Sequence, residues 1–126
     1  MKFQPDTPLG VNVVTRHESG RVWVGATAHD HSLLLPWSGA VLPWDVDGFD
    51  ALGAAHFDRL LALAPELVIF GSGVRLRFPP AAWLRGLIDR RIGVETMDTA
   101  AACRTYNVLV SEGRSAVAAL LLAPAA

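Results

Sequence analysis

The chain has 126 residues, which suits one ordinary domain and is too short for two separate hydrophobic cores. Hydrophobic residues make up 52% and charged residues 18%, which excludes a disordered chain, and 11 basic against 12 acidic residues leave no cationic excess for binding nucleic acid. The single cysteine, Cys103, excludes an internal disulfide, and the apolar run over 116–124 is about half of the ~20 residues that a membrane span needs, so we expect a cytoplasmic protein without membrane insertion.

Three short segments of the first part of the chain have the composition of strands: 11–15, 21–26 and 32–35. Turn residues at 18–20 separate the first two, so these predict an N-terminal β-hairpin. The third ends at Pro36, because proline cannot donate to a ladder. A proline-bounded loop over 36–44 follows, with room for one short strand around 40–42.

Asp47 or Asp50 can cap a first helix. From there to the end of the chain, segments with the apolar spacing of a helix alternate with apolar segments typical of strands. This pattern predicts, in chain order, a helix to residue 64, a strand over 66–70, a helix from 79–80 to Gly93, a strand over 94–97, a helix over 98–111 and a strand over 116–122. The strands over 66–70 and 94–97 should run parallel, because a helix joins them. The last strand is almost wholly apolar, which predicts a central position. We therefore expect one α/β domain over 1–126, with three layers and a mixed sheet.

Gly71, Ser72 and Gly73 end a buried strand at the position where open α/β sheets bind ligands. Glycines allow backbone amides to turn toward an anion, and an extended segment over 74–78 would put Arg75 and Arg77 on one face. This hypothesis gives a candidate anion pocket of Gly71, Ser72, Gly73, Arg75, Arg77, Arg104, Tyr106 and Asn107. The alternative is a tight turn followed by an edge strand that its charges protect from aggregation.

Other side chains that could bind or react have simpler interpretations. His29 and His31 lie on one side of an extended chain, but no third ligand is evident nearby, so we expect a polar strand end and no metal site. Cys103 falls in the middle of a predicted helix, which favours a small core residue over a nucleophile. Trp37 and Trp44 lie in the proline-bounded loop, where we expect at least one exposed ring that serves as an interface anchor.

The second half of the chain also resembles a known family. Pro-Glu-Leu-Val-Ile-Phe-Gly-Ser-Gly over 65–73, Pro79-Pro80, Gly-Val-Glu-Thr-Met over 93–97 and the segment 99–114 are similar in order and spacing to the family called domain of unknown function 498/598. That family includes small bacterial and archaeal proteins and a mitochondrial assembly factor of respiratory complex I. The resemblance implies a three-layer fold with a five-stranded mixed sheet whose last strand runs antiparallel to the rest.

Two hypotheses of function follow. The first is a non-enzymatic accessory or assembly-type protein that needs no cofactor and acts through contacts with a protein partner or with its own copy. The second is a protein, with or without enzymatic activity, that binds a small anion or nucleotide through the Gly71–Gly73 turn and the neighbouring arginines. Convergence of Arg75, Arg77 and Arg104 on one pocket would favour the second hypothesis.

Overall fold

A five-stranded mixed sheet, in the order β5-β4-β8-β6-β7, lies at the centre of the computed structural model, which describes residues 10–122. Its strands are β4 (Leu33–Pro36), β5 (Leu42–Pro43), β6 (Leu67–Gly71), β7 (Gly93–Met97) and β8 (Ala116–Leu120). Every residue of β4, β6 and β8 is buried, as expected of apolar strands that are covered on both faces. The predicted central position of the last strand is confirmed.

The direction of the last strand differs from the expectation. β8 runs parallel to β6, and β6 runs parallel to β7, whereas β4 is antiparallel to β8. The implied antiparallel last strand is therefore wrong. Helix α3 (Thr99–Ser111) carries the chain from the end of β7 back along the sheet, so that β8 starts at the same end as β6.

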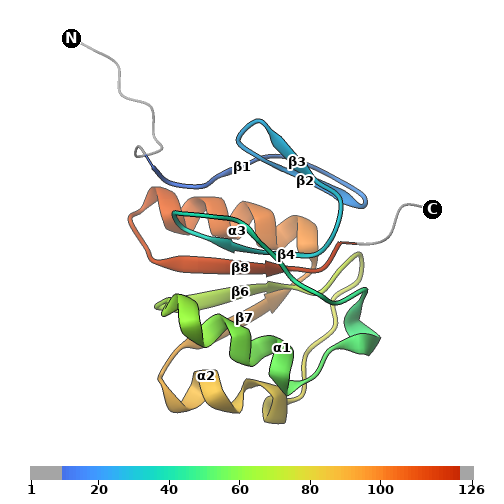
Figure 1. Ribbon diagram of the computed structural model, residues 1–126, viewed down its shortest axis with the longest axis vertical. Coiled ribbons are helices and arrows are strands. Elements are labelled where there is room, and N and C mark those ends of the chain that lie inside the picture. The colour runs from blue at the N-terminus through green and yellow to red at the C-terminus, as the bar shows by residue number, and fades with distance from the viewer. Residues whose placement is uncertain (1–9, 123–126) are drawn as a thin grey trace.

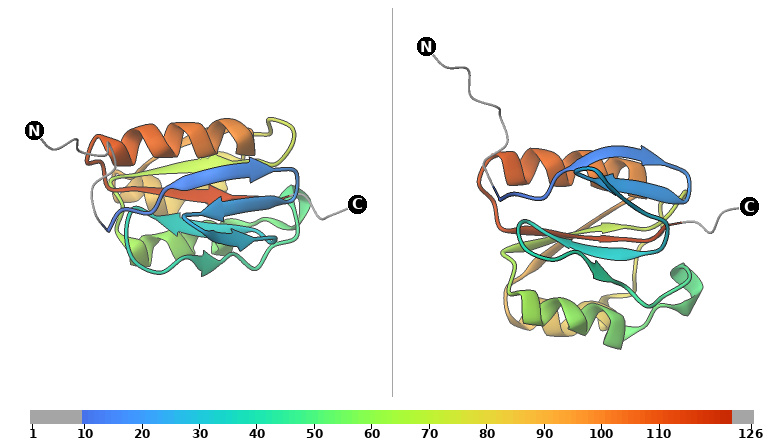
Figure 2. Two further views of the ribbon diagram at one scale, coloured as in Figure 1. Left: turned by 90° about the horizontal axis from the view of Figure 1, so that it is seen from above. Right: turned by 45° about the horizontal axis from the view of Figure 1, so that its top comes forward.

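The predicted N-terminal hairpin is confirmed and is extended by a third strand. β1 (Val14–Glu18), β2 (Arg21–Val24) and β3 (Thr27–His29) form a separate antiparallel sheet. This sheet and α3 cover one face of the central sheet, as Figures 1 and 2 show. The opposite face carries α1 (Ala54–Asp58), the 3-10 helix η2 (Arg59–Leu63) and α2 (Arg85–Asp89), which gives the three expected layers.

Each face of the central sheet has its own hydrophobic core, because side chains of a strand alternate between faces. In β6, Leu67 and Ile69 pack in the core under α3, whereas Val68 and Phe70 pack in the core under α1 and α2. The N-terminal sheet is joined to the first of these cores by Val22, which is fully buried.

Several helices are shorter than the sequence predicts. The expected helix to residue 64 consists of η1 (Phe49–Ala51), α1 and η2, and the helix expected from residue 79 consists of η3 (Ala81–Leu84) and α2. Helix α3 matches its prediction, and the carboxylate of Asp98 caps it by accepting the Ala101 amide at 2.9 Å. No strand forms over 74–78, so this segment is not the edge strand that the alternative interpretation placed after the turn.

Candidate functional site

The candidate site lies where β6 and β7 end. These parallel strands are neighbours, but the chain leaves β6 toward α2 on one face and leaves β7 toward α3 on the other. In open α/β sheets such a divergence opens a crevice at the carboxyl ends of the strands. The residues after the two strands, Gly71–Gly73 and Asp98–Thr99, therefore occupy the position that the sequence singled out.

Hydrogen bonds join the two loops across this crevice. The Ser72 amide donates to the Met97 carbonyl at 2.8 Å, and the Thr99 amide donates to the Gly73 carbonyl at 2.9 Å. The Gly73 amide donates to Thr99 Oγ1 at 2.9 Å, and that hydroxyl donates to the Leu121 carbonyl at 2.7 Å. The amides of Ser72 and Gly73, which the anion hypothesis assigns to a ligand, are thus bound within the protein.

The two glycines of the turn have different physical roles. Gly73 has a φ of 104°, a backbone conformation that favours glycine. Gly71 is required for space, because a Cβ there would lie 3.0 Å from the Cα and Oγ1 of Thr99. Part of the Gly-Ser-Gly pattern therefore reflects the close approach of β6 to the first residue of α3.

The three arginines of the anion hypothesis have different surroundings. Arg77 donates to Asp50 Oδ1 at 2.9 Å, and its guanidinium lies 4.1 Å from the centre of the Phe49 ring. Phe49 packs against the core under α1 and α2. Arg104 belongs to α3, on the opposite face, and lines a hollow beside β1. Arg75 is exposed.

Tyr106 and Asn107, the remaining candidates for the anion pocket, are bound to the N-terminal part of the chain. The Tyr106 hydroxyl donates toward the carbonyls of Asn12 and Pro36, at 2.8 and 3.0 Å, and burial raises the pKa of this side chain. Asn107 Oδ1 accepts the Val14 amide at 2.9 Å, and Asn107 Nδ2 donates to the Val14 carbonyl at 2.7 Å. These contacts hold β1 against α3.

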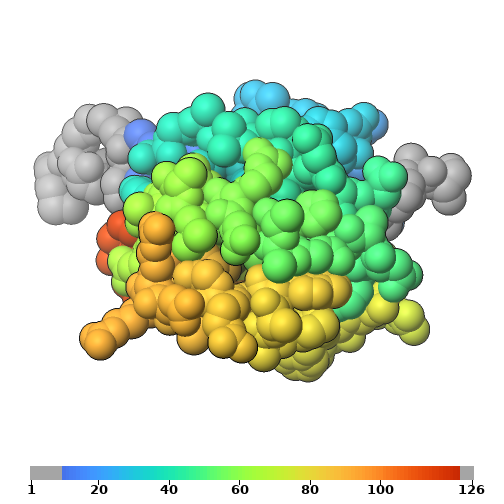
Figure 3. Space-filling model, turned by 60° about the horizontal axis from the view of Figure 1, so that its bottom comes forward, coloured from blue at the N-terminus to red at the C-terminus, as the bar shows by residue number. Residues whose placement is uncertain are grey.

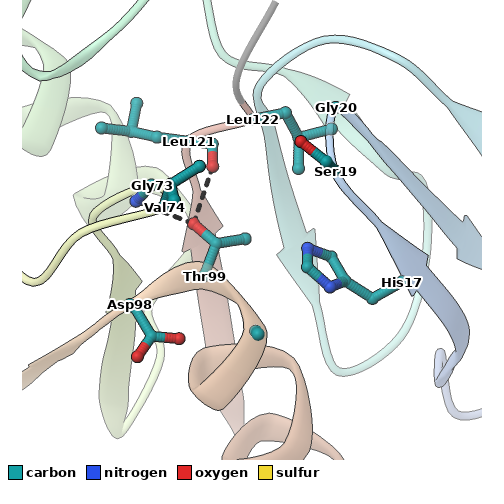
Figure 4. A pocket seen from close by; sticks show the side chains of 10 residues that line it. His17, Ser19, Gly20, Gly73, Val74, Asp98, Thr99, Leu121 and Leu122 are labelled. Atoms are coloured by element: carbon teal, nitrogen blue, oxygen red, sulfur yellow. Dashed lines mark hydrogen bonds between the residues drawn. The ribbon is translucent and has the colours of Figure 1, made fainter. Parts of the chain in front are cut away.

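A hollow of about 200 Å³ opens beside the joined loops. It is lined by His17, Ser19, Gly20, Gly73, Val74, Asp98, Thr99, Ala100, Leu121 and Leu122. Figure 4 shows His17 reaching from β1 toward the first turn of α3, and shows the hydroxyl of Thr99 bonded to Leu121. Asp98 caps α3 and Thr99 joins the loops, so the other polar side chains of the lining are His17 and Ser19, both from the N-terminal hairpin. The sequence gives no signal for His17, because it follows from packing of the N-terminal sheet on α3.

The segment that follows the site carries exposed apolar side chains. Val74, Leu76 and Phe78 expose 75%, 53% and 69% of their surface. We call Val74–Phe78 the apolar segment. Ser72 fixes its start, because the Ser72 hydroxyl donates to the Arg75 carbonyl at 2.7 Å and accepts the Arg77 amide at 3.0 Å. With Arg77 held by Asp50, the segment presents its apolar side chains on an anchored backbone.

The tryptophans of the proline-bounded loop do not form an exposed pair. Trp44 is 2% exposed, packs edge-on against Phe57 and Phe70, and donates from Nε1 to the His56 carbonyl at 3.1 Å. The expectation of an exposed interface ring is wrong for Trp44, because β5 pairs with β4 and folds the loop back onto the sheet. Trp37 is half-buried and packs against both cores.

The remaining candidates, Cys103, His29 and His31, lie in surroundings that do not favour a reactive or metal-binding role. Burial raises the pKa of Cys103 to about 12, which keeps its thiol protonated and unreactive at neutral pH. The rings of His29 and His31 lie 6.4 Å apart, and burial, followed by the charge of His31, lowers the pKa of His29. Within residues 10–122, no three His, Cys, Asp or Glu side chains gather as a metal site would require.

Comparison with known proteins gives consistent results. The family described as "Protein of unknown function (DUF498/DUF598)" matches residues 14–121. The chain is 33% identical over 97% of its length to the "NADH dehydrogenase [ubiquinone] 1 alpha subcomplex assembly factor 3" of Bos taurus, and it spans 66% of that protein. It is 29% identical over 76% of its length to the "13 kDa major membrane protein" of Francisella tularensis, and it spans 79% of that protein.

A solved structure shows the same fold. A crystal structure of a protein from Bordetella parapertussis superposes with a TM-score of 0.86 and 35% sequence identity, and the match covers 91% of this chain and 99% of the other. Between residues 10 and 122, no helix is both long and apolar enough to cross a membrane.

Proposed function

Because the chain belongs to the DUF498/DUF598 family and is 33% identical to an assembly factor of NADH dehydrogenase, we propose that it is an assembly-type accessory protein that acts through protein contacts. The contact surface is the apolar segment Val74–Phe78. The proposal needs no bound cofactor, since its chemistry is recognition of another protein.

The observation that carries this proposal is the exposure of three large apolar side chains on one short, anchored segment. Exposed apolar groups that are held in place bind a partner at a low cost in conformational entropy. The bonds of Ser72 and the contact of Arg77 with Asp50 supply that anchoring. In Figure 1 the segment leaves the end of β6 and runs beside η1 toward η3, and Figure 3 shows the surface of the face that carries α1 and α2, in green and orange.

Other parts of the proposal follow from composition. The near balance of charge supports a protein partner over nucleic acid, and the single cysteine supports a cytoplasmic location. We further propose that residues 1–126 act as one domain. Contact between two copies of the chain is the simplest form of the proposed interaction.

The test is site-specific cross-linking in cells that make the protein naturally. A photoreactive phenylalanine analogue replaces Phe78 in one variant and Val108 in a control variant. Val108 is a suitable control because it is 55% exposed on α3, away from the apolar segment. We expect defined cross-linked products from position 78 that are absent from position 108.

The cross-linked protein is then purified and its affinity measured with the isolated chain. We expect Leu76→Ser and Phe78→Ser each to weaken binding by tenfold or more, because removal of a central apolar anchor typically costs about 2 kcal/mol. Val108→Ser should leave the affinity unchanged. Equal cross-linking from both positions, or equal effects of all three substitutions, would show that the apolar segment is not the contact.

A further inference from the structure

A second surface of the molecule is suited to protein contact: the outer edge of β7. This strand is the last of the order β5-β4-β8-β6-β7, so β6 pairs with one of its sides and no strand among residues 10–122 pairs with the other. Its residues are exposed or half-buried, whereas those of β6 and β8 are all buried. The helices therefore leave this edge accessible.

The hydrogen bonds identify the backbone groups on the outer side. The Met97 carbonyl accepts the Ser72 amide, so the backbone of Met97 faces the β6 side. In a parallel ladder alternate residues bond to the same neighbour. Gly93 and Glu95 therefore also face β6, and the N–H and C=O groups of Val94 and Thr96 point away from the sheet. These groups offer two donors and two acceptors to an added strand.

The side chains of β7 define what such a strand would meet. Val94 packs at the border of the core under α1 and α2, and Met97 packs at the border of the core under α3. Glu95, between them, is exposed. Because side chains alternate between faces, an added strand would meet the negative charge of Glu95 beside Met97 on one face and Val94 on the other.

The charge of Glu95 disfavours pairing of β7 with the same strand of a second copy of the chain. An antiparallel pairing of β7 with its own copy uses all the outward groups of Val94 and Thr96 only when it is centred on Glu95. That register places two Glu95 side chains directly opposite each other, and like charges in this position destabilise the pair. A partner strand with a basic residue at that position would have the opposite effect.

We propose that the outer edge of β7 receives an extended segment of another protein, which pairs with the backbone of Val94 and Thr96 and places a basic residue opposite Glu95. This inference rests on the proposed function in that the partner is a protein. The two surfaces are tested separately, because the substitutions at Leu76 and Phe78 leave β7 unchanged.

The probe is a capped synthetic peptide, Thr-Val-Lys-Val-Thr, added to the full chain while its amide resonances are recorded by NMR. We expect shifts of the Val94 and Thr96 amides that increase with peptide concentration. A peptide with Glu in place of Lys should bind about two- to fivefold more weakly, as expected for an unfavourable cross-strand charge pair. A peptide N-methylated on its backbone should give no shifts, because it cannot donate to the edge.

The variant Glu95→Lys should reverse the preference between the Lys and Glu peptides, and its exposed side chain makes the change compatible with folding. Unchanged Val94 and Thr96 amides with all peptides at millimolar concentration would overturn the proposal. A preference that does not follow the charge at position 95 would also overturn it, as would dilution-dependent shifts of these amides without peptide, which would assign the edge to a second copy.

Discussion

Thr99 is the residue on which the candidate site depends most. Its hydroxyl accepts the Gly73 amide and donates to the Leu121 carbonyl, and its own amide donates to the Gly73 carbonyl. One buried side chain therefore connects the ends of β6, β8 and α3. A buried polar group that loses its partner costs free energy, so the loops should be sensitive to small changes at this position.

We predict that Thr99→Val lowers the free energy of unfolding by about 1–3 kcal/mol, because valine keeps the shape but leaves the Gly73 amide and the Leu121 carbonyl without their partner. Thr99→Ser, which keeps the hydroxyl, should cost clearly less. Urea denaturation followed by circular dichroism measures both variants. Equal stability of the valine and serine variants would mean that the hydroxyl contributes only packing.

At the scale of elements, the closest contact in the site is between β6 and α3. A Cβ on Gly71 would lie only 3.0 Å from the Cα of Thr99, whereas a Cβ on Gly93, at the start of β7, would have nothing within 4 Å. The two glycines thus form a matched pair within neighbouring strands.

We predict that Gly71→Ala destabilises the fold by about 1–3 kcal/mol, because the added methyl group forces β6 and α3 apart. Gly93→Ala should change stability by less than about 0.5 kcal/mol. Thermal and chemical denaturation of the two variants test this difference. If both substitutions have the same effect, the approach of β6 to α3 is not a constraint on the fold.

The elements differ in how well the sequence predicts them. β6 and β8 are continuous apolar runs, and α3 has a cap and a regular stripe, so local patterns are sufficient to predict them. The burial of Trp44 and the non-strand path of the apolar segment depend on contacts with residues far along the chain, such as Phe70 for Trp44. The location of the candidate site at Gly71–Gly73 can be predicted from the order of strands and helices. The hydrogen bonds from Gly73 to Thr99 and from Thr99 to Leu121 cannot, because they join residues that are far apart in the sequence. The direction of β8 is a similar case, because it follows from the path of α3 over the sheet.

At the scale of the whole molecule, two sheets share one core under α3. The smaller sheet, β1 to β3, is held by the bonds of Asn107 with Val14 and of Tyr106 with Asn12. His17, Ser19 and Gly20 of this sheet line the hollow, so its shape depends on where the sheet is held. The attachment of the N-terminal sheet therefore controls the shape of the candidate site.

We predict that Asn107→Ala lowers the free energy of unfolding by about 1–3 kcal/mol, because the amide and the carbonyl of Val14 both lose their hydrogen-bond partner. The N-terminal sheet should open locally before the rest of the domain unfolds. Amide hydrogen exchange should become faster in β1 and β2 and stay slow in β8. Val108→Ala, at the next residue of the helix and exposed, serves as the control. Equal acceleration in β1, β2 and β8 would indicate that the two sheets unfold as one unit.

The central position of β8 has a consequence for biosynthesis. β8 comes after the other strands in the chain, yet β4 and β6 are joined only through it. While the ribosome is still translating the codons for residues 116–120, β4 and β6 each expose an unpaired edge. Unpaired apolar edges are prone to aggregation, so the partly made chain is at its most aggregation-prone until β8 covers both edges. The pairs β4–β5 and β6–β7 do not include β8, but the central sheet can be completed only once β8 has been translated and inserted between them.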